Sequence, residues 1–291
     1  MFLKKLFLKP NLIAFYKEEE IYRVLNEQYK KDKTIFSETK EFENKKDLKN
    51  YINSIIEENP QTYVSTITTT QNQGATPSCD KHYYKDAGID TANIKFICIN
   101  KKYSFYTTLY ELMALKKEYP FIDYLYSPFA LIDSKSSLRQ NSLYVLATKE
   151  NCFMLIYKDN IPVFADIFEF QEDSVNNDEE IEDISDMDII EDFDENLDEN
   201  IENVDEPEEE EEEESNMENF NIEYKILEHV KTTLKEYYNS DGDFIEKIII
   251  FDAIGLEKAI TKLIDEDIFI QSDIENIDIL KTINNISRQN V

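Results

Sequence analysis

Apolar and polar positions over residues 143–170 predict three short strands joined by tight turns. The apolar runs cover 143–146, 153–157 and 163–168, and polar residues at 149–151 and 158–160 separate them. Val, Ile, Phe and Tyr suit a pleated, buried surface, and consecutive strands joined by short turns pair antiparallel. This segment therefore predicts a three-stranded meander.

Residues 11–69 repeat that pattern near the start of the chain. Strands are predicted over 12–16, 21–29, 34–42 and 63–69. Before the last of these, apolar residues recur at helical spacing and predict a helix over 47–58, with Pro60 just beyond its end. The order of this half is β-β-β-α-β.

The same order returns after the meander. A helix is predicted over 220–237, a buried strand over 246–251 and an amphipathic helix over 256–264. Residues 268–270 predict a further strand and 279–283 a terminal helix. Two such halves indicate a duplicated α/β fold with mixed sheets and helices on their faces; two unrelated α+β domains are the alternative.

A separate unit lies between the halves. Residues 70–90 are polar and predict a loop, 94–99 predict a strand, and Phe105, Leu109, Leu112, Met113 and Tyr119 predict a helix from about Ser104. A strand over 121–126 and a helix beginning at 129–132 then lead into the second half.

The charge of the chain is concentrated in one segment. The formal net charge is −31, and residues 171–214 contain 25 Asp and Glu with no Lys or Arg, against 31 basic and 37 acidic residues elsewhere. Without a basic stripe, nucleic-acid binding is disfavoured. The acidic segment buries too little apolar surface to offset chain entropy and is predicted to be disordered. It is either a solvated tether or, through its interspersed Ile, Met, Phe and Leu residues, a docking segment for a basic partner.

The termini and cysteines bear on location. No apolar run approaches the ~18–20 residues that cross a bilayer, and residues 1–10, MFLKKLFLKP, lack the features of a secretory signal. This leader is read as an edge strand or frayed end, or as a basic apolar segment on a membrane surface. Cys79, Cys98 and Cys152 are odd in number and have no paired spacing, which predicts free thiols in a reducing cytoplasm.

Candidate chemistry is sparse. Cys79 and His82 are close in sequence, but a zinc site needs about four ligands and the other histidine, His229, lies on a predicted helix. A Cys–His nucleophile lacks an orienting third group, and 239–243, NSDGD, predicts a helix-ending turn better than a calcium loop. We therefore predict no catalytic, cofactor-binding or metal-binding residues.

The order of elements resembles the actin-like ATPase superfamily, and most of all the PilM family of type IV pilus assembly; the GspL cytoplasmic domain of type II secretion and FtsA are similar. The paired halves, the lack of an insertion between Phe42 and Asp47, the unit at 70–119 and the passage FIDYLYSPFALI at 121–132 carry the likeness. It implies duplicated actin/ribonuclease H-like halves. The implied boundaries are a leader at 1–10, a first half at 11–69 and 121–140, a 1C-type insertion at 70–120, a second half at 141–170 and 216–291, and a disordered acidic insert at 171–215.

The resemblance also bears on nucleotide binding. Active members hold ATP between the halves, where glycine in the strand 1–strand 2 hairpins lets backbone N–H groups approach the phosphates. The corresponding turns here, 16–20 and 147–151, contain no glycine, and a later loop keeps only Gly255. Three carboxylates at Glu18, Glu19 and Glu20 would repel a triphosphate by about 1–4 kcal/mol per close pair. We expect no cofactor and no enzymatic activity.

Family members dock the cytoplasmic tail of a single-pass, PilN-like inner-membrane protein between subdomains 1A and 1C. Here the matching face would draw on residues 63–70 and the helix at 104–119. We therefore expect a cytoplasmic scaffold at the inner-membrane face, serving a type IV pilus, a type II secretion or competence system, or a pilus-derived flagellar motor. The alternatives are an ATPase with degenerate loops and an adaptor that binds a basic partner through its acidic insert.

Overall fold

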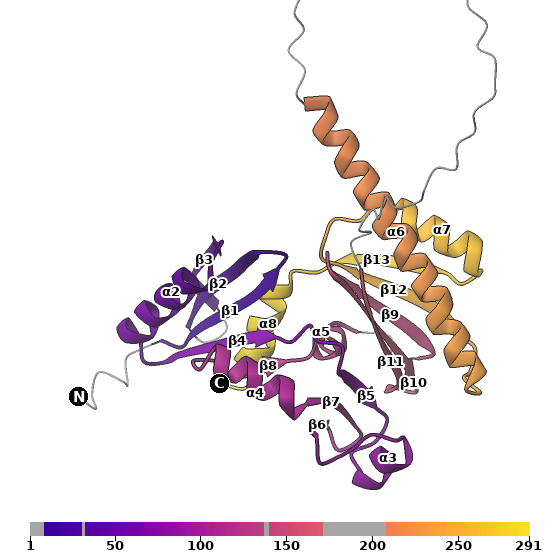
Figure 1. The fold of residues 1–291 in the computed structure, drawn as a ribbon, viewed down its shortest axis with the longest axis horizontal. Coiled ribbons are helices and arrows are strands. Elements are labelled where there is room, and N and C mark those ends of the chain that lie inside the picture. Colours follow the sequence, from indigo (N-terminus) through magenta and orange to yellow (C-terminus); the bar gives the residue numbers. More distant parts are fainter. Residues whose placement is uncertain (1–8, 31–32, 137–139, 171–207) are drawn as a thin grey trace, which may run out of the picture.

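Two α/β halves lie side by side, with a smaller inserted unit beneath them (Figure 1). The computed structural model describes residues 9–30, 33–136, 140–170 and 208–291, with the backbone alone for 208–220. Most of the predicted leader, at 1–8, and most of the predicted acidic insert, at 171–207, lie outside the described residues.

The first half is a five-stranded mixed sheet of order β3-β2-β1-β4-β8. Its strands are β1 (Asn11–Glu18), β2 (Ile21–Lys30), β3 (Lys33–Phe42), β4 (Thr62–Ile67) and β8 (Tyr124–Tyr126). Strands β1 to β3 are antiparallel neighbours, whereas β4 runs parallel to β1 and β8 parallel to β4. Helix α2 (Lys45–Glu58) covers one face, where its Leu48 and Ile52 pack against apolar side chains of the sheet.

The second half repeats this arrangement, with strand order β11-β10-β9-β12-β13. Its strands are β9 (Ser142–Ala147), β10 (Asn151–Lys158), β11 (Ile161–Glu169), β12 (Lys247–Asp252) and β13 (Ser272–Asn276). Helices α6 (Glu208–Asn239) and α7 (Ala259–Ile268) pack on its outer face. Strand order and direction match the first half position by position, so the predicted duplication is confirmed.

The last helix of each half packs on the sheet of the other half. Helix α5 (Pro128–Lys135) ends the first half and contacts β9 and β10, and α8 (Ile279–Arg288) ends the second half and contacts β1, β2 and β4. Both helices contribute to one apolar core shared by the halves, through buried side chains such as Phe129 and Ile283. A hydrogen bond from Asn284 Nδ2 to Glu27 Oε2 (2.8 Å) also holds α8 on the first sheet.

The insertion follows β4 and forms its own small sheet of order β5-β7-β6. It consists of β5 (Gln73–Thr76), α3 (Lys81–Asp86), β6 (Ile94–Ile99), β7 (Tyr103–Thr108) and α4 (Leu109–Glu118). Asp133 of α5 accepts hydrogen bonds from Tyr103 of β7 and from Tyr157 of β10. The insertion is therefore anchored to both halves.

Three element predictions are wrong. Residues 104–108 belong to strand β7, and the helix begins at Leu109 with Thr108 as its N-cap, because the backbone of β7 pairs with both β5 and β6. The segment 70–90 contains β5 and α3 as well as loop. The strand predicted at 268–270 lies at Ser272–Asn276, because Phe269 takes a left-handed conformation that ends α7.

Helix α6 also starts earlier than predicted, at Glu208 within the glutamate run. Glutamate has a high helix propensity, and negative charge near a helix N-terminus interacts favourably with the helix dipole. The last part of the predicted disordered insert, 208–215, is therefore helical.

Candidate functional site

The turns that would cradle phosphate in an actin-like ATPase contact each other directly. The backbone N–H of Glu19, at the tip of the β1–β2 turn, donates a hydrogen bond to Glu150 Oε1 in the β9–β10 turn. Lys149 Nζ of that second turn lies 3.3 Å from Glu19 Oε1. These two contacts bridge the halves across the entrance of the cleft.

A buried carboxylate lies immediately behind this bridge. Glu18 is 5% exposed, and its Oε2 lies 3.1 Å from Arg23 Nη1. Its Oε1 has no hydrogen-bond partner among the described residues. Burial raises the pKa of Glu18, with Arg23 opposing the shift, and burial together with the Glu18 charge raises the pKa of Tyr16 to about 12. The two hairpins thus enclose a buried carboxylate that is paired with one arginine.

The space left between the turns is small. The cavity has a volume of about 10 Å³, whereas small-molecule sites typically measure about 300–1,000 Å³. Its walls are formed by both halves: Tyr16, Lys17, Glu18, Ile67, Thr69, Thr148, Glu150 and Asn151. In this conformation the cavity is the size of about one water molecule.

In the loop after β12, backbone N–H groups donate hydrogen bonds to a side chain at the start of the same loop. Asp252 Oδ1 accepts hydrogen bonds from the backbone N–H groups of Ile254 and Gly255, and Oδ2 accepts one from Leu256, each at 2.9 Å. Gly255 has a φ of +87°, a left-handed conformation that favours glycine. The three N–H groups that could face a ligand are therefore bound to a side chain of the same loop.

The second predicted site is the face between the first half and the insertion. At the start of α4, the Glu111 carboxylate accepts hydrogen bonds from Thr70 Oγ1 (2.9 Å), Asn72 Nδ2 (2.8 Å) and Thr108 Oγ1 (2.9 Å). At its other end, Lys45 Nζ of α2 lies 2.6 Å from Glu118 Oε1. Helix α4 is thus held at its start by the loop at 70–72 and at its end by α2 of the first half.

Between these anchors α4 exposes large apolar side chains. Tyr110 is 82% exposed and Met113 69%, and no residue of α4 is fully buried. Isolated exposed apolar residues are common, but two on successive turns of a short, anchored helix form an apolar surface. We call Tyr110 and Met113 the α4 face.

The predicted contribution of residues 63–70 is only partly present. Val64 to Thr68 are buried, because α2 packs on one side of β4 and α8 on the other, where Ser65 Oγ lies 2.7 Å from Ser287 Oγ. Tyr63, Thr69 and Thr70 are half-buried and remain accessible from this strand and its continuation.

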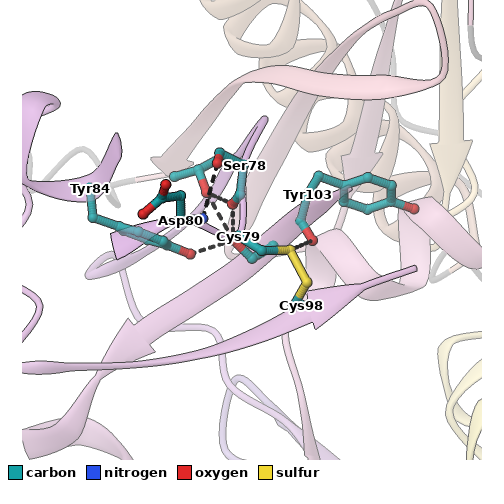
Figure 2. Close-up of a disulfide and its surroundings, with 8 residues drawn as sticks. Ser78, Cys79, Asp80, Tyr84, Cys98 and Tyr103 are labelled. Atoms are coloured by element: carbon teal, nitrogen blue, oxygen red, sulfur yellow. Dashed lines mark hydrogen bonds between the residues drawn. A yellow bond between two sulfur atoms is a disulfide. The ribbon is translucent and has the colours of Figure 1, made fainter. Parts of the chain in front are cut away.

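The prediction of three free cysteines is wrong for two of them. Cys79 and Cys98 form a disulfide, with their Cα atoms 5.5 Å apart (Figure 2). The sequence gives no sign of this pairing, because β6 and the end of β5 come together through their separate pairing with β7. Cys152 is free and buried, and burial raises the pKa of its thiol.

The histidines do not form a site with these cysteines. His82 lies on α3 next to the disulfide-bonded Cys79, and His229 stacks on Phe168 in the second half. Within the described ranges, no cluster of three or more His, Cys, Asp or Glu residues is placed to hold a metal ion.

A surface groove that the sequence did not indicate lies between α6 and α7. It has a volume of about 480 Å³ and is lined by Lys231, Leu234, Lys235, Tyr238, Asn239, Phe244, Asp267, Ile268 and Ile270. Phe244, which lines the groove, is 67% exposed, and Phe269, between the lining residues Ile268 and Ile270, is 86% exposed. The signal that could have revealed this groove is the presence of two aromatic residues, Phe244 and Phe269, in polar turns where they fit neither helical nor strand periodicity.

Family comparison divides the chain where the fold does. Residues 8–133 match the model described as Domain of unknown function (DUF8569), and residues 143–291 match that described as Domain of unknown function (DUF8341). The second match spans more than half of the chain. The chain belongs to the DUF8341 family. The two matched regions meet near the connection between α5 and β9. The DUF8569 model therefore corresponds to the first half with its insertion, and the DUF8341 model to the second half.

No curated protein matches the DUF8341 chain, whereas several solved structures are similar to it. A Bacteroides thetaiotaomicron protein with an actin-like ATPase fold and unknown function is 10% identical, with 97% of this chain and 95% of that chain covered and a TM-score of 0.46. The cytoplasmic domain of EpsL, an inner-membrane component of the type II secretion system of Vibrio cholerae, is 8% identical, with coverages of 97% and 95% and a TM-score of 0.42.

A chain of the PilM–PilN type IV pilus biogenesis complex is 8% identical, with 95% of this chain and 90% of that chain covered and a TM-score of 0.54. At this identity the likeness shows a shared fold. Together with the duplicated sheets, it confirms the predicted PilM-like, actin-like fold of the DUF8341 chain.

Within the residues that the structure describes, no helix is both long enough and apolar enough to cross a bilayer.

Proposed function

We propose that this protein is a PilM-like scaffold that docks the cytoplasmic tail of a single-pass, PilN-like inner-membrane protein in a type IV pilus, type II secretion or related assembly, without hydrolysing ATP. In this proposal it acts in the cytoplasm at the inner-membrane face. The docking surface is the α4 face together with the accessible end of β4.

The α4 face carries the docking part of the proposal. It exposes Tyr110 and Met113 on a helix whose ends are held by Glu111 and Glu118. A surface held in place loses little conformational entropy on binding, and aromatic and Met side chains are enriched at interfaces. The shared fold with a chain of the PilM–PilN complex supports a peptide-like tail as the occupant.

The contact between the hairpins supports the absence of ATP hydrolysis. A triphosphate would have to displace the Glu19–Glu150 and Glu19–Lys149 contacts, approach the buried Glu18 carboxylate and compete with Asp252 for the loop donors. Each of these steps costs free energy that a glycine-rich phosphate hairpin does not require.

Nucleotide binding can be measured on the full chain. We expect a fluorescent ATP analogue with Mg²⁺ to show no saturable binding at micromolar concentrations, with an ATP-binding actin-like protein as positive control. Saturable micromolar binding or measurable turnover would favour an ATPase with degenerate loops.

Docking can be tested in the native cell with a photo-crosslinking residue at Tyr110 or Met113. We expect adducts with the cytoplasmic tail of a single-pass inner-membrane protein, mapped by mass spectrometry. The same residue at Phe244, which is 67% exposed on the second half, is the matched control and should give no such adduct.

The captured tail, made as a synthetic peptide, then allows a direct measurement. We expect Met113→Asp to weaken its binding about ten-fold or more, because burial of an unpaired carboxylate in an apolar contact costs more than ~1.4 kcal/mol. Phe244→Asp should leave the binding unchanged. Equal effects of the two substitutions would place the docking site elsewhere.

A further inference from the structure

The disulfide lies in the insertion, whose small sheet has the strand order β5-β7-β6. Cys98 is on edge strand β6, and Cys79 follows β5 in the segment that leads to α3. Figure 2 shows the bond beside Tyr103, whose carbonyl oxygen is 3.2 Å from Cys79 Sγ. Strand pairing places Cys98 opposite Ser104.

The two sulfurs differ from the third cysteine in accessibility. Cys98 is exposed and Cys79 is half-buried, whereas Cys152 is completely buried in the second half. A thiolate must reach a disulfide sulfur along the S–S axis for exchange to occur. An external thiol can therefore approach Cys98 Sγ while the chain remains folded.

The bond closes a loop that holds the start of α4. This loop, 79–98, contains Asn93, whose carbonyl oxygen accepts a hydrogen bond from the Leu109 N–H (2.7 Å). Ile94 of the same loop pairs with Thr108, the N-cap of α4. The start of α4 is thus tied to the segment that the disulfide closes.

Opening the bond would leave α3 in place. Tyr84 of α3 is buried, contacts the Phe96 ring with centroids 4.9 Å apart, and is hydrogen-bonded through its hydroxyl to Ser104 Oγ. The end of β6 has fewer such contacts, because Ile97 is 59% exposed and Cys98 is exposed. Loosening would therefore affect the edge strand, the segment before it and the start of α4, which that segment holds.

We propose that Cys79 and Cys98 form a reversible redox site that controls the order of β6 and of the start of α4. The reductant is a dithiol. Its thiolate attacks Cys98 Sγ and forms a mixed disulfide, while the Cys79–Cys98 bond breaks and Cys79 leaves as a thiolate that takes up a proton. The second thiol of the reductant then displaces Cys98, so that two electrons pass to the protein and the reductant becomes a disulfide.

This inference goes beyond the proposed function and needs no partner for its test. The full chain is oxidised with glutathione disulfide and then treated with dithiothreitol in native buffer. Samples taken before and after reduction are alkylated, and the adducts are counted by mass spectrometry. We expect no adduct before reduction, two adducts on Cys79 and Cys98 after it, and a third on Cys152 only in denaturant. Cys152 serves as the internal control for the folded state.

Hydrogen exchange of the same samples measures the structural consequence. We expect reduction to speed exchange at 90–99 and 108–112 by about ten-fold or more. The Cys79→Ser/Cys98→Ser double variant should show the same exchange as the reduced protein. Exchange in peptides from β9 and β10 should be unchanged. The proposal is overturned if no disulfide forms under oxidation, if reduction requires denaturant, or if exchange at both segments is the same in the two states.

Discussion

A single buried side chain, Glu18, sets the electrostatic character of the cleft between the halves. Its burial raises its own pKa and contributes to the raised pKa of Tyr16, and Arg23 offsets only part of that cost. The residue type could be identified in the sequence as unfavourable for a triphosphate. Its burial could not, because it results from the contact of two hairpins far apart along the chain.

The raised pKa of Glu18 makes stability depend on pH in a defined direction. The folded state binds the Glu18 proton more tightly than the unfolded state, so its contribution to stability falls as pH rises from the ordinary carboxyl pKa through the raised one. Glu18→Gln removes this titration. We expect the variant to gain stability relative to the wild type as pH rises from 4 to 7, measured as the free energy of unfolding in urea.

The control for this measurement is Glu20→Gln, whose side chain is 93% exposed in its pair with Lys17. It should change the free energy of unfolding by only a few tenths of a kcal/mol at either pH. A Glu18→Gln difference that is the same at pH 4 and pH 7, or that becomes less favourable to the variant as pH rises, would contradict the assignment.

Helix α4 shows how one short element acquires a functional face. It has no fully buried residue, so polar anchors at its two ends supplement the packing of the half-buried Leu115 against the core of the first half. Sequence periodicity alone extended it to Ser104, because Phe105 and Leu109 are spaced like neighbours on a helix. Pairing with β5 and β6 turned residues 103–108 into a strand instead.

We expect Glu111→Ala to release α4 from the loop at 70–72. The substitution removes four hydrogen bonds to the carboxylate, and their donors are partly solvated and regain water. The loss of local stability should therefore be about 1–3 kcal/mol. Hydrogen exchange at 70–73 and 108–112 should accelerate. Glu118→Ala on the same helix, which removes one partly exposed ion pair with Lys45, should have an effect below about 1 kcal/mol; equal effects would show that Glu111 is not the anchor.

At the scale of the whole molecule, the exchanged helices α5 and α8 make the two halves one folding unit. The core that they share with both sheets contains side chains from each half and from the insertion. Such a core resists the opening of the cleft, which is consistent with a scaffold that holds one conformation.

We expect Ile283→Ala on α8 to destabilise the whole chain by about 2–5 kcal/mol, because the side chain is fully buried between the halves. Unfolding followed by circular dichroism and by hydrogen exchange of each half should keep a single shared transition. Ile35→Ala on edge strand β3, where the side chain is 43% exposed, should cost less than about 1 kcal/mol. Separate transitions for the two halves would contradict a shared folding unit.

Much of the fold could be predicted from local patterns. The apolar runs of β1, β9, β10 and β12 are continuous, and the amphipathic spacing of α2 is regular, so these patterns predicted the duplicated order. Predictions failed where local spacing fits two structures, as at 104–108, or where a turn residue such as Phe269 takes an unusual conformation.

The sequence by itself determined the two β-β-β-α-β halves, the lack of glycine in the hairpins and the concentration of acid in one segment, because these follow from residue type and spacing along the chain. Tertiary structure alone decided the closure of the cleft by Glu19, Lys149 and Glu150, the burial of most of β4, and the bond between Cys79 and Cys98. Each of these features depends on segments that are distant in sequence and come into contact only when the sheets form and the last helices pack on the opposite halves. No local sequence pattern predicts such contacts.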